Sequence, residues 1–256
     1  MSNDALYVYG VVRFSLDLDW LEEGINGQKV YLISEGNAGA LVHDCEEKAY
    51  ASENPEEIKG MIISHNQILD RAMKDFEGVI PFSFNTIIRK GTDSAQVNLK
   101  KWLHDDRERL EMIWDKIKGK KEYGLRVYYE KDKLREEAAS HKEVKQIEKN
   151  IEGKGQGLSY LLQGKARSKA QEIFQERVNT LKQESLDGIK MVTSEVVNNP
   201  SRVFLEGEKE VLLSISVLIE EKEINKIEEF LEKKAGDFPF QIAGPFAPYS
   251  FVENGK

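Results

Sequence analysis

The sequence contains few of the residues from which metal and redox sites are built. Cys45 is the single cysteine among 256 residues, and only four histidines are present. One cysteine forms no disulfide within the chain and no multi-cysteine zinc site. Because the histidines are scattered, they offer no closed ligand set either. We therefore expect neither a metal nor a cofactor.

Long apolar runs are also absent. No run reaches the roughly eighteen apolar residues of a membrane-spanning helix, and Met1–Asp4 lacks the basic start and apolar core of a secretory signal. We therefore expect a cytoplasmic protein without a membrane partner. Lysine and arginine number 37 against 45 acidic residues, a net charge of -8, which argues against a nucleic acid partner.

A phosphate-binding loop is missing as well. Gly153, Gly155 and Gly157 are spaced like a glycine-rich loop, but no predicted strand precedes them and no Gly-Lys-Ser/Thr follows. We interpret the segment as a linker.

Two sets of side chains are of types that bind metals or act in catalysis. His43, Asp44 and Cys45 are consecutive, but neighbouring residues of a strand point to opposite faces, so we interpret them as a strand end. His65 lies on the apolar stripe of a predicted helix without a Ser, Cys or Asp beside it, so a hydrogen-bonded core histidine is favoured over a general base.

Residues 1–118 predict an N-terminal α+β domain. A strand that is apolar at nearly every position covers residues 6–12, and a hairpin joins strands 30–33 and 40–43. Asn54 caps a helix with an apolar stripe to Phe76, residues 79–88 form a strand, and residues 92–118 form a second amphipathic helix. Packed as two layers, these elements predict a ferredoxin-like sandwich.

Residues 119–256 predict a second α+β domain, a helical hairpin on a small sheet. Its strands are expected at 123–129, 211–219 and 240–242. A densely charged helix at 132–152 and a helix from 158 to about 184 form the hairpin, and a short helix follows at 224–235.

An apolar cluster lies between the strands expected at 6–12 and 30–33, and it consists of Phe14, Leu16, Leu18, Trp20 and Leu21. Residues 20–23 suit one helical turn ended by Gly24. Because interfaces favour large aromatic residues, the cluster is a candidate partner-binding surface, and packing in the core is the alternative.

The stretch from residue 240 to 251 contains four aromatic residues and two prolines. Such density predicts a segment docked against the protein, with Tyr249 and Phe251 largely buried. Gly244-Pro245 is expected to stop the strand that begins at Phe240, since proline lacks an N–H.

This stretch resembles the tGPWPPYsF ending of gas vesicle accessory proteins of the F/L type. Six residues match: Gly244, Pro245, Pro248, Tyr249, Ser250 and Phe251. Phe246 and Ala247 depart from that pattern, and the phenylalanine keeps an aromatic plug. The family's vlPlrFGt segment is matched by Ile80, Pro81, Phe82, Phe84 and Thr86, with Asn85 in the place of glycine; asparagine tolerates the left-handed region better than most residues. Residues 7–11 and 122–127 also resemble the family.

The resemblance implies a non-enzymatic cytoplasmic protein that helps to assemble the shell of a gas vesicle. It implies contacts with the small hydrophobic shell protein and with other accessory proteins, and it leaves open whether the chain stays in the finished wall or acts as a chaperone that leaves. We expect residues 1–118 to bind the shell subunit through an apolar groove or an open sheet edge. An enzyme or small-ligand domain is the rival, for which the sequence shows neither a paired acid and base nor a phosphate loop.

Overall fold

The computed structural model describes residues 4–14, 20–199, 209–234 and 239–252. The chain divides into two compact units. Unit 1 comprises Met1–Glu122 with Pro245–Lys256, and unit 2 comprises Tyr123–Gly244. The chain therefore leaves unit 1, builds unit 2 and returns to unit 1. The expected division at residue 118 places the boundary close by, but it assigns the returning segment to the second domain, whereas the structure places it in unit 1.

Unit 1 is an α+β unit built on one six-stranded sheet. The strand order is β2-β3-β4-β1-β5, and β6 pairs with β1 beyond the end of β5. Its elements, in chain order, are β1 (Ala5–Arg13), β2 (Leu21–Glu23), η1 (Ile25–Gly27), β3 (Lys29–Glu35), β4 (Ala38–Cys45), α1 (Pro55–Asp75), β5 (Gly78–Pro81), β6 (Ile87–Arg89), α2 (Ala95–Asp105) and α3 (Arg107–Ile117).

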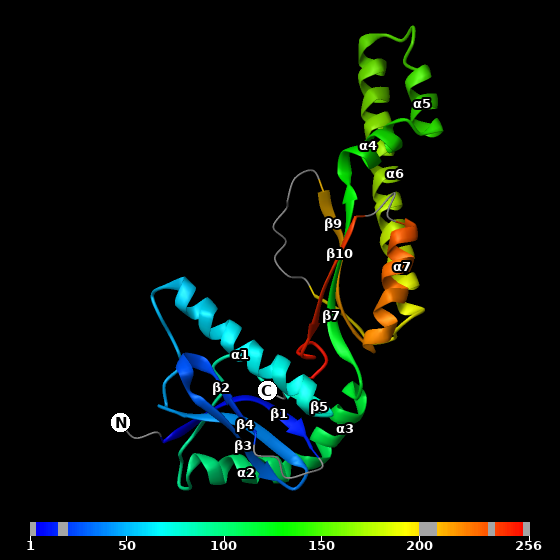
Figure 1. Cartoon of the computed structure of the whole chain (residues 1–256). Helices are drawn as coiled ribbons and strands as arrows, with labels where there is room; N and C mark the ends of the chain where they lie inside the picture. Colours follow the sequence, from blue (N-terminus) through cyan, green and yellow to red (C-terminus); the bar gives the residue numbers. More distant parts are fainter. Residues whose placement is uncertain (1–3, 15–19, 200–208, 235–238, 253–256) are drawn as a thin grey trace. The chain divides into compact units, whose positions relative to one another are not determined.

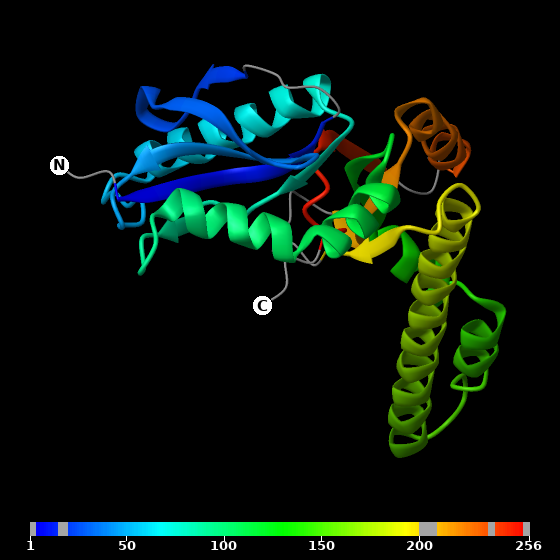
Figure 2. The ribbon, with the colours of Figure 1, turned by 90° about the horizontal axis from the view of Figure 1, so that it is seen from below.

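Strand β1 lies inside this sheet and is buried from Ala5 to Val12, as its continuous apolar sequence predicts. Tyr7 hydrogen-bonds His65 of α1, while the next residue, Val8, lines a pocket with Leu99 of α2. Because consecutive strand residues point to opposite faces, α1 and α2 cover opposite faces of the sheet (Figures 1 and 2). Unit 1 is therefore the expected α+β unit, with a third layer of helices added to the two layers of a ferredoxin-like sandwich.

The local signals of unit 1 form as the sequence predicts. The side chain of Asn54 accepts a hydrogen bond from the backbone of Glu56, which satisfies a free N–H at the start of α1. The β3–β4 hairpin turns through Gly36, whose φ of +62° is left-handed.

Three expected elements of unit 1 differ from the structure. Residues 20–23 contain the short strand β2 and not a helical turn, because Leu21–Glu23 pair with β3. The expected strand at 79–88 is broken, because the backbone leaves β1 after Pro81 and turns at Asn85 before β6 begins. The expected helix at 92–118 is two helices, α2 and α3, joined at Asp106.

Unit 2 packs helices against a four-stranded sheet of order β10-β7-β9-β8. Along β7, alternate side chains from Tyr123 to Tyr129 enter the core of the unit, which is the period of a strand with one covered face. Its elements are β7 (Lys121–Glu130), α4 (Lys131–Ala139), α5 (Lys142–Lys149), α6 (Gln156–Lys190), β8 (Val196–Asn198), β9 (Lys209–Ile219), η2 (Glu221–Glu223), α7 (Ile224–Lys234) and β10 (Phe240–Phe246).

The expected helical hairpin is present in unit 2, with different bounds. Helices α4 and α5, separated at Ser140–His141, replace one helix at 132–152, and both pack against α6 (Figure 2). Helix α6 extends to Lys190, past the expected end near 184. Strand β10 runs through Gly244 and Pro245, so these residues do not stop it. Among the described residues, no helix is long and apolar enough to cross a membrane.

Candidate functional site

Two tyrosine–histidine pairs lie at the centre of unit 1, between β1, β4 and α1. The hydroxyl of Tyr7 lies 2.8 Å from Nδ1 of His65, and that of Tyr9 lies 2.9 Å from Nδ1 of His43. On its other side, Nε2 of His43 lies 2.8 Å from the hydroxyl of Tyr50. The four residues of the two pairs are at most 1% exposed. Their polar atoms are therefore paired within the protein and not with solvent.

The tautomer of His65 follows from its partners. Its Nε2 lies 3.0 Å from the carbonyl oxygen of Phe82, which only accepts, so Nε2–H donates to it. Nδ1 therefore accepts from Tyr7. Burial lowers the pKa of both His43 and His65 to about 4, and it raises the pKa of Tyr7 and Tyr9. All four residues are neutral near pH 7 and make a structural network, so His65 is the hydrogen-bonded core histidine that its stripe predicts.

The His43–Cys45 segment does not gather metal ligands. The side chain of Asp44 accepts a hydrogen bond from Tyr31, and His43 belongs to the core network. Burial, ahead of the nearby Asp44 charge, raises the pKa of the Cys45 thiol to about 11, which opposes formation of the thiolate that metals bind. In the described parts of the chain, no three His, Cys, Asp or Glu residues are placed to hold a metal ion.

An apolar pocket opens on the α2 face of unit 1, beside β6. Its volume is about 140 Å³. Phe82 and Trp102 pack edge to face across it, with ring centroids 5.7 Å apart. The lining residues are Val8, Phe82, Thr86, Ile88, Leu99, Trp102 and Arg109. Next to it, β5 and β6 pair with β1 and with no other described strand, so a sheet edge and an apolar pocket lie together. We name this region the edge pocket.

The segment Ala247–Val252, here called the tail, docks onto unit 1. Ala247, Phe251 and Val252 are at most 5% exposed. The carboxylate of Glu122 accepts two hydrogen bonds from Ser250, one from the backbone N–H at 2.8 Å and one from Oγ at 2.6 Å. Nζ of Lys116 donates to the carbonyl oxygen of Phe251 at 3.3 Å. The docked segment expected from its aromatic residues is therefore present.

Tyr249 differs from that expectation in one respect. It is 37% exposed and not largely buried. Its hydroxyl nevertheless lies 3.1 Å from Nε2 of His65 and donates to Oδ1 of Asn66 at 3.2 Å. The tail thus joins the tyrosine–histidine network through one hydroxyl group.

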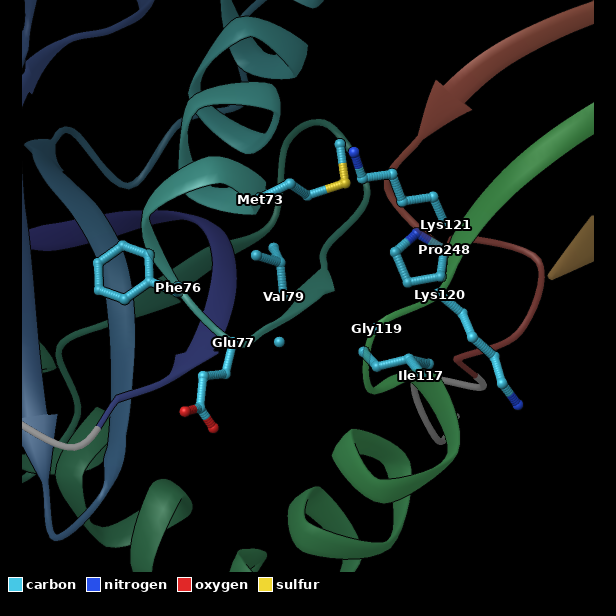
Figure 3. A pocket seen from close by; sticks show the side chains of 10 residues that line it. Met73, Phe76, Glu77, Val79, Ile117, Gly119, Lys120, Lys121 and Pro248 are labelled. Carbon is cyan, nitrogen blue, oxygen red and sulfur yellow. The ribbon is translucent and has the colours of Figure 1, made fainter. Parts of the chain in front are cut away.

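A second hollow, of about 210 Å³, lies where the tail meets the end of α1 and the start of β5 (Figure 3). Met73 of α1, Val79 of β5 and Pro248 of the tail supply apolar side chains. Glu77 and Lys120 supply charged ones. Every residue that lines this hollow belongs to unit 1.

The described members of the proposed partner-binding cluster differ in their exposure. Trp20 is 6% exposed, its indole Nε1–H donates to Asp75 at 2.9 Å and its ring packs against Phe76. Phe14 is partly buried against the same core, and Leu21 is 52% exposed. Leu16 and Leu18 lie outside the described residues. Trp20 is therefore a core residue, which was the alternative interpretation of the cluster.

The family model of the gas vesicle synthesis protein GvpL/GvpF matches residues 5–253. The chain belongs to this family. Gas vesicle protein L of Haloferax mediterranei is 26% identical over 245 residues, covering 92% of this chain and 74% of that protein. Gas vesicle protein F of Dolichospermum flosaquae is 22% identical over 263 residues, covering 97% of each. The resemblance of the sequence motifs to the F/L type is thereby confirmed.

Solved structures of GvpF share the fold. The crystal structure from Anabaena sp. PCC7120 aligns with a TM-score of 0.77 at 19% identity and covers 99% of this chain and 100% of that one. The structure from Microcystis aeruginosa aligns with a TM-score of 0.65 at 14% identity and covers 97% and 98%. The mixed α+β fold of this GvpL/GvpF protein is therefore shown. Its membership of the family supports the role of a gas vesicle accessory protein.

The motif residues of this GvpL/GvpF chain have physical explanations in the structure. Pro81 ends β5, and Phe82 turns into the edge pocket. Asn85 has a φ of +70° and bonds both the backbone N–H and the carbonyl of Tyr50 with its side-chain amide. A glycine there satisfies the backbone conformation, but only asparagine adds these two bonds. Phe84 packs against the rings of Tyr7 and His65.

Motif residues Gly244, Pro245 and Phe246 lie on the exposed end of β10, with Phe246 45% exposed. The sequence patterns indicate no role for Tyr50 or Glu122. Tyr50 lies outside the expected elements, and Glu122 lies just before the strand expected at 123–129, so neither residue carries a periodic signal. The match of residues 122–127 to the family was the one available indication for Glu122.

Proposed function

We propose that this chain helps to build gas vesicles in the cytoplasm by binding the small hydrophobic shell subunit through unit 1. A shell subunit must present an apolar face to gas, and that face would aggregate if it were left exposed before assembly. The edge pocket supports this proposal, because it combines apolar side chains with a sheet edge at which the described residues place no further strand. Other accessory proteins are further expected partners.

The edge pocket suits either of two binding modes. A strand of the subunit can pair with the backbone along β5 or β6, or an amphipathic helix can insert apolar side chains beside Phe82 and Trp102. The first mode uses backbone pairing and the second uses spaced apolar anchors. Neither needs a metal or nucleotide, so we propose a non-enzymatic role. The chain then acts either as a chaperone that leaves or as a minor component of the finished wall. Washing purified vesicles and blotting for this chain distinguishes the two roles.

Co-purification of the shell subunit with variants of the full chain tests the proposal. Ile88→Glu places a charge in the edge pocket, and Trp102→Ala removes its largest apolar side chain. We expect each to weaken binding by about 2 kcal/mol, roughly thirtyfold. Val97→Glu is the matched control, because Val97 lies on α2 but is 41% exposed and outside the pocket.

Melting curves of all three variants accompany the binding measurement, so that loss of fold is separated from loss of contact. Unchanged binding by both pocket variants would contradict the role of the edge pocket. A small-ligand or enzymatic function remains the rival, and it gains support only if a small molecule raises the melting temperature of the full chain while the shell subunit does not bind.

A further inference from the structure

The start of α6 carries apolar side chains that the described part of unit 2 leaves uncovered. Leu158, Tyr160 and Leu161 are 49%, 76% and 67% exposed. They lie in the first turns of the helix, while α5 packs along another side of it (Figure 2). Exposed apolar residues that occur singly need no explanation, but three within four positions of one helix do.

The same part of α6 differs in charge from the rest of the chain. From residue 153 to residue 171 the sequence contains four basic residues and no acidic one, in a chain with a net charge of -8. Lys169 pairs with Glu143 and Glu172. Among the described residues, no carboxylate forms an ion pair with Lys154, Lys165 or Arg167. Three positive charges thus lie near the exposed apolar side chains, and no described carboxylate of the chain pairs with them.

Helical spacing arranges these side chains in two rows. Leu158, Leu161 and Lys165 follow each other at intervals of three and four and form one row. Tyr160 and Arg167 are seven residues apart, two turns of helix, and form the other.

Between the rows lie Gly157 and Gly164. A Cβ atom added at either position would meet nothing within 4 Å, so the strip between the rows is low and open. Two raised rows beside a low strip form the groove into which a second helix packs.

We propose that this surface, consisting of Leu158, Tyr160, Leu161, Lys165 and Arg167 and here called the arm surface, binds an acidic amphipathic helix of a partner protein. The leucines and the tyrosine supply apolar contacts on both sides of that helix, and the cations pair with its carboxylates. A flat anionic membrane fits less well, because Tyr160 and the leucines do not form one continuous face and the net charge of the chain is repelled by anionic lipid. The proposal is independent of the edge pocket, which lies in unit 1.

Titration of the full chain with a fluorescent helical peptide tests the arm surface. The probe carries leucines on one face and glutamates on the other, and a peptide of the same composition in scrambled order is its control. We expect the helical peptide to bind about tenfold more tightly than the scrambled one or better. Lys165→Glu/Arg167→Glu should abolish that difference, and so should Leu158→Ser/Leu161→Ser.

Lys182→Glu/Lys190→Glu is the matched control, because it reverses the same charge at exposed positions of the same helix. It should bind the peptide as the unmodified chain does. An equal loss of peptide binding in this control would overturn the proposal. So would unchanged peptide binding in the two variants of the arm surface. A second experiment measures binding of the chain to vesicles of phosphatidylglycerol and phosphatidylcholine. Stronger binding to these vesicles than to the peptide would assign the arm surface to a membrane instead.

A photo-crosslinking residue at position 160 supplies the test in cells that make gas vesicles, with position 191 as its control because Met191 is 88% exposed at the far end of α6. Mass spectrometry of the adduct should identify an acidic segment with apolar residues at helical spacing. An adduct with a second copy of this chain, with lipid, or identical to that of the control position would count against the proposal.

Discussion

Trp20 and Leu21 are neighbours with opposite surroundings. Trp20→Ala removes a buried ring and the hydrogen bond to Asp75, so we expect a loss of about 3 to 5 kcal/mol in the free energy of unfolding. Leu21→Ala should change it by about 0.5 kcal/mol or less, since Leu21 is half exposed. Urea unfolding measures both. Equal effects would show that Trp20 is not part of the core.

The buried histidines make stability depend on pH. The pKa of His43 and of His65 is about 4 in the folded protein and about 6.5 in an unfolded chain. Between these values the unfolded chain binds more protons, so stability falls as the pH is lowered from about 6.5 toward 4. Each histidine contributes up to about 1.4 kcal/mol per pH unit.

His65→Gln should therefore reduce the slope of melting temperature against pH in that range, while its amide still donates to the carbonyl of Phe82. Thermal melts at several pH values, with circular dichroism near pH 7 as the check on folding, measure this. The same slope in the variant and the unmodified chain would mean that His65 is not held neutral by burial.

At the scale of single elements, the tail shows how a short motif is fixed in place. Glu122→Gln replaces one of the two carboxylate oxygens that accept hydrogen bonds from Ser250 with an NH2 group, which cannot accept. We expect a cost of about 1 to 3 kcal/mol in the free energy of unfolding. A chain that ends after Phe246 loses the burial of the tail as well, so its melting temperature should fall further, by several degrees. Phe246→Ala is the control, because Phe246 is 45% exposed. A melting temperature unchanged by the truncation would refute docking of the tail.

Some helices and strands could be predicted from the sequence, and some of their ends and contacts could not. Continuous or periodic apolar patterns predicted β1, α1, β7 and β9, because β1 and much of β9 are buried on both faces and α1 and β7 are each buried along one face. The patterns did not predict the breaks at Asp106 and Ser140, where the same stripe continues into the next helix. They also missed the Glu122–Ser250 contact, since two residues 128 positions apart leave no local signal.

At the scale of the whole molecule, unit 1 is discontinuous in sequence. We expect a chain in which residues 123–244 are replaced by a short glycine–serine linker to fold and to melt cooperatively, because Glu122 and Ser250 already lie within hydrogen-bond distance. Residues 1–118 alone lack both the tail and Glu122 and should melt several degrees lower. Circular dichroism melts compare the two. Equal melting temperatures would mean that the returning segment adds nothing to unit 1.

The path of the chain also sets an order of events on the ribosome. Synthesis proceeds from the N-terminus, and domains generally fold as units while they emerge. All of unit 2 is made after the sheet of unit 1 and before the tail that docks onto it. Unit 1 therefore lacks Pro248, the tail residue that lines the hollow beside Met73 and Val79, while more than a hundred further residues are translated. During that interval unit 2 can fold, so maturation of the nascent protein ends in the unit whose synthesis began first.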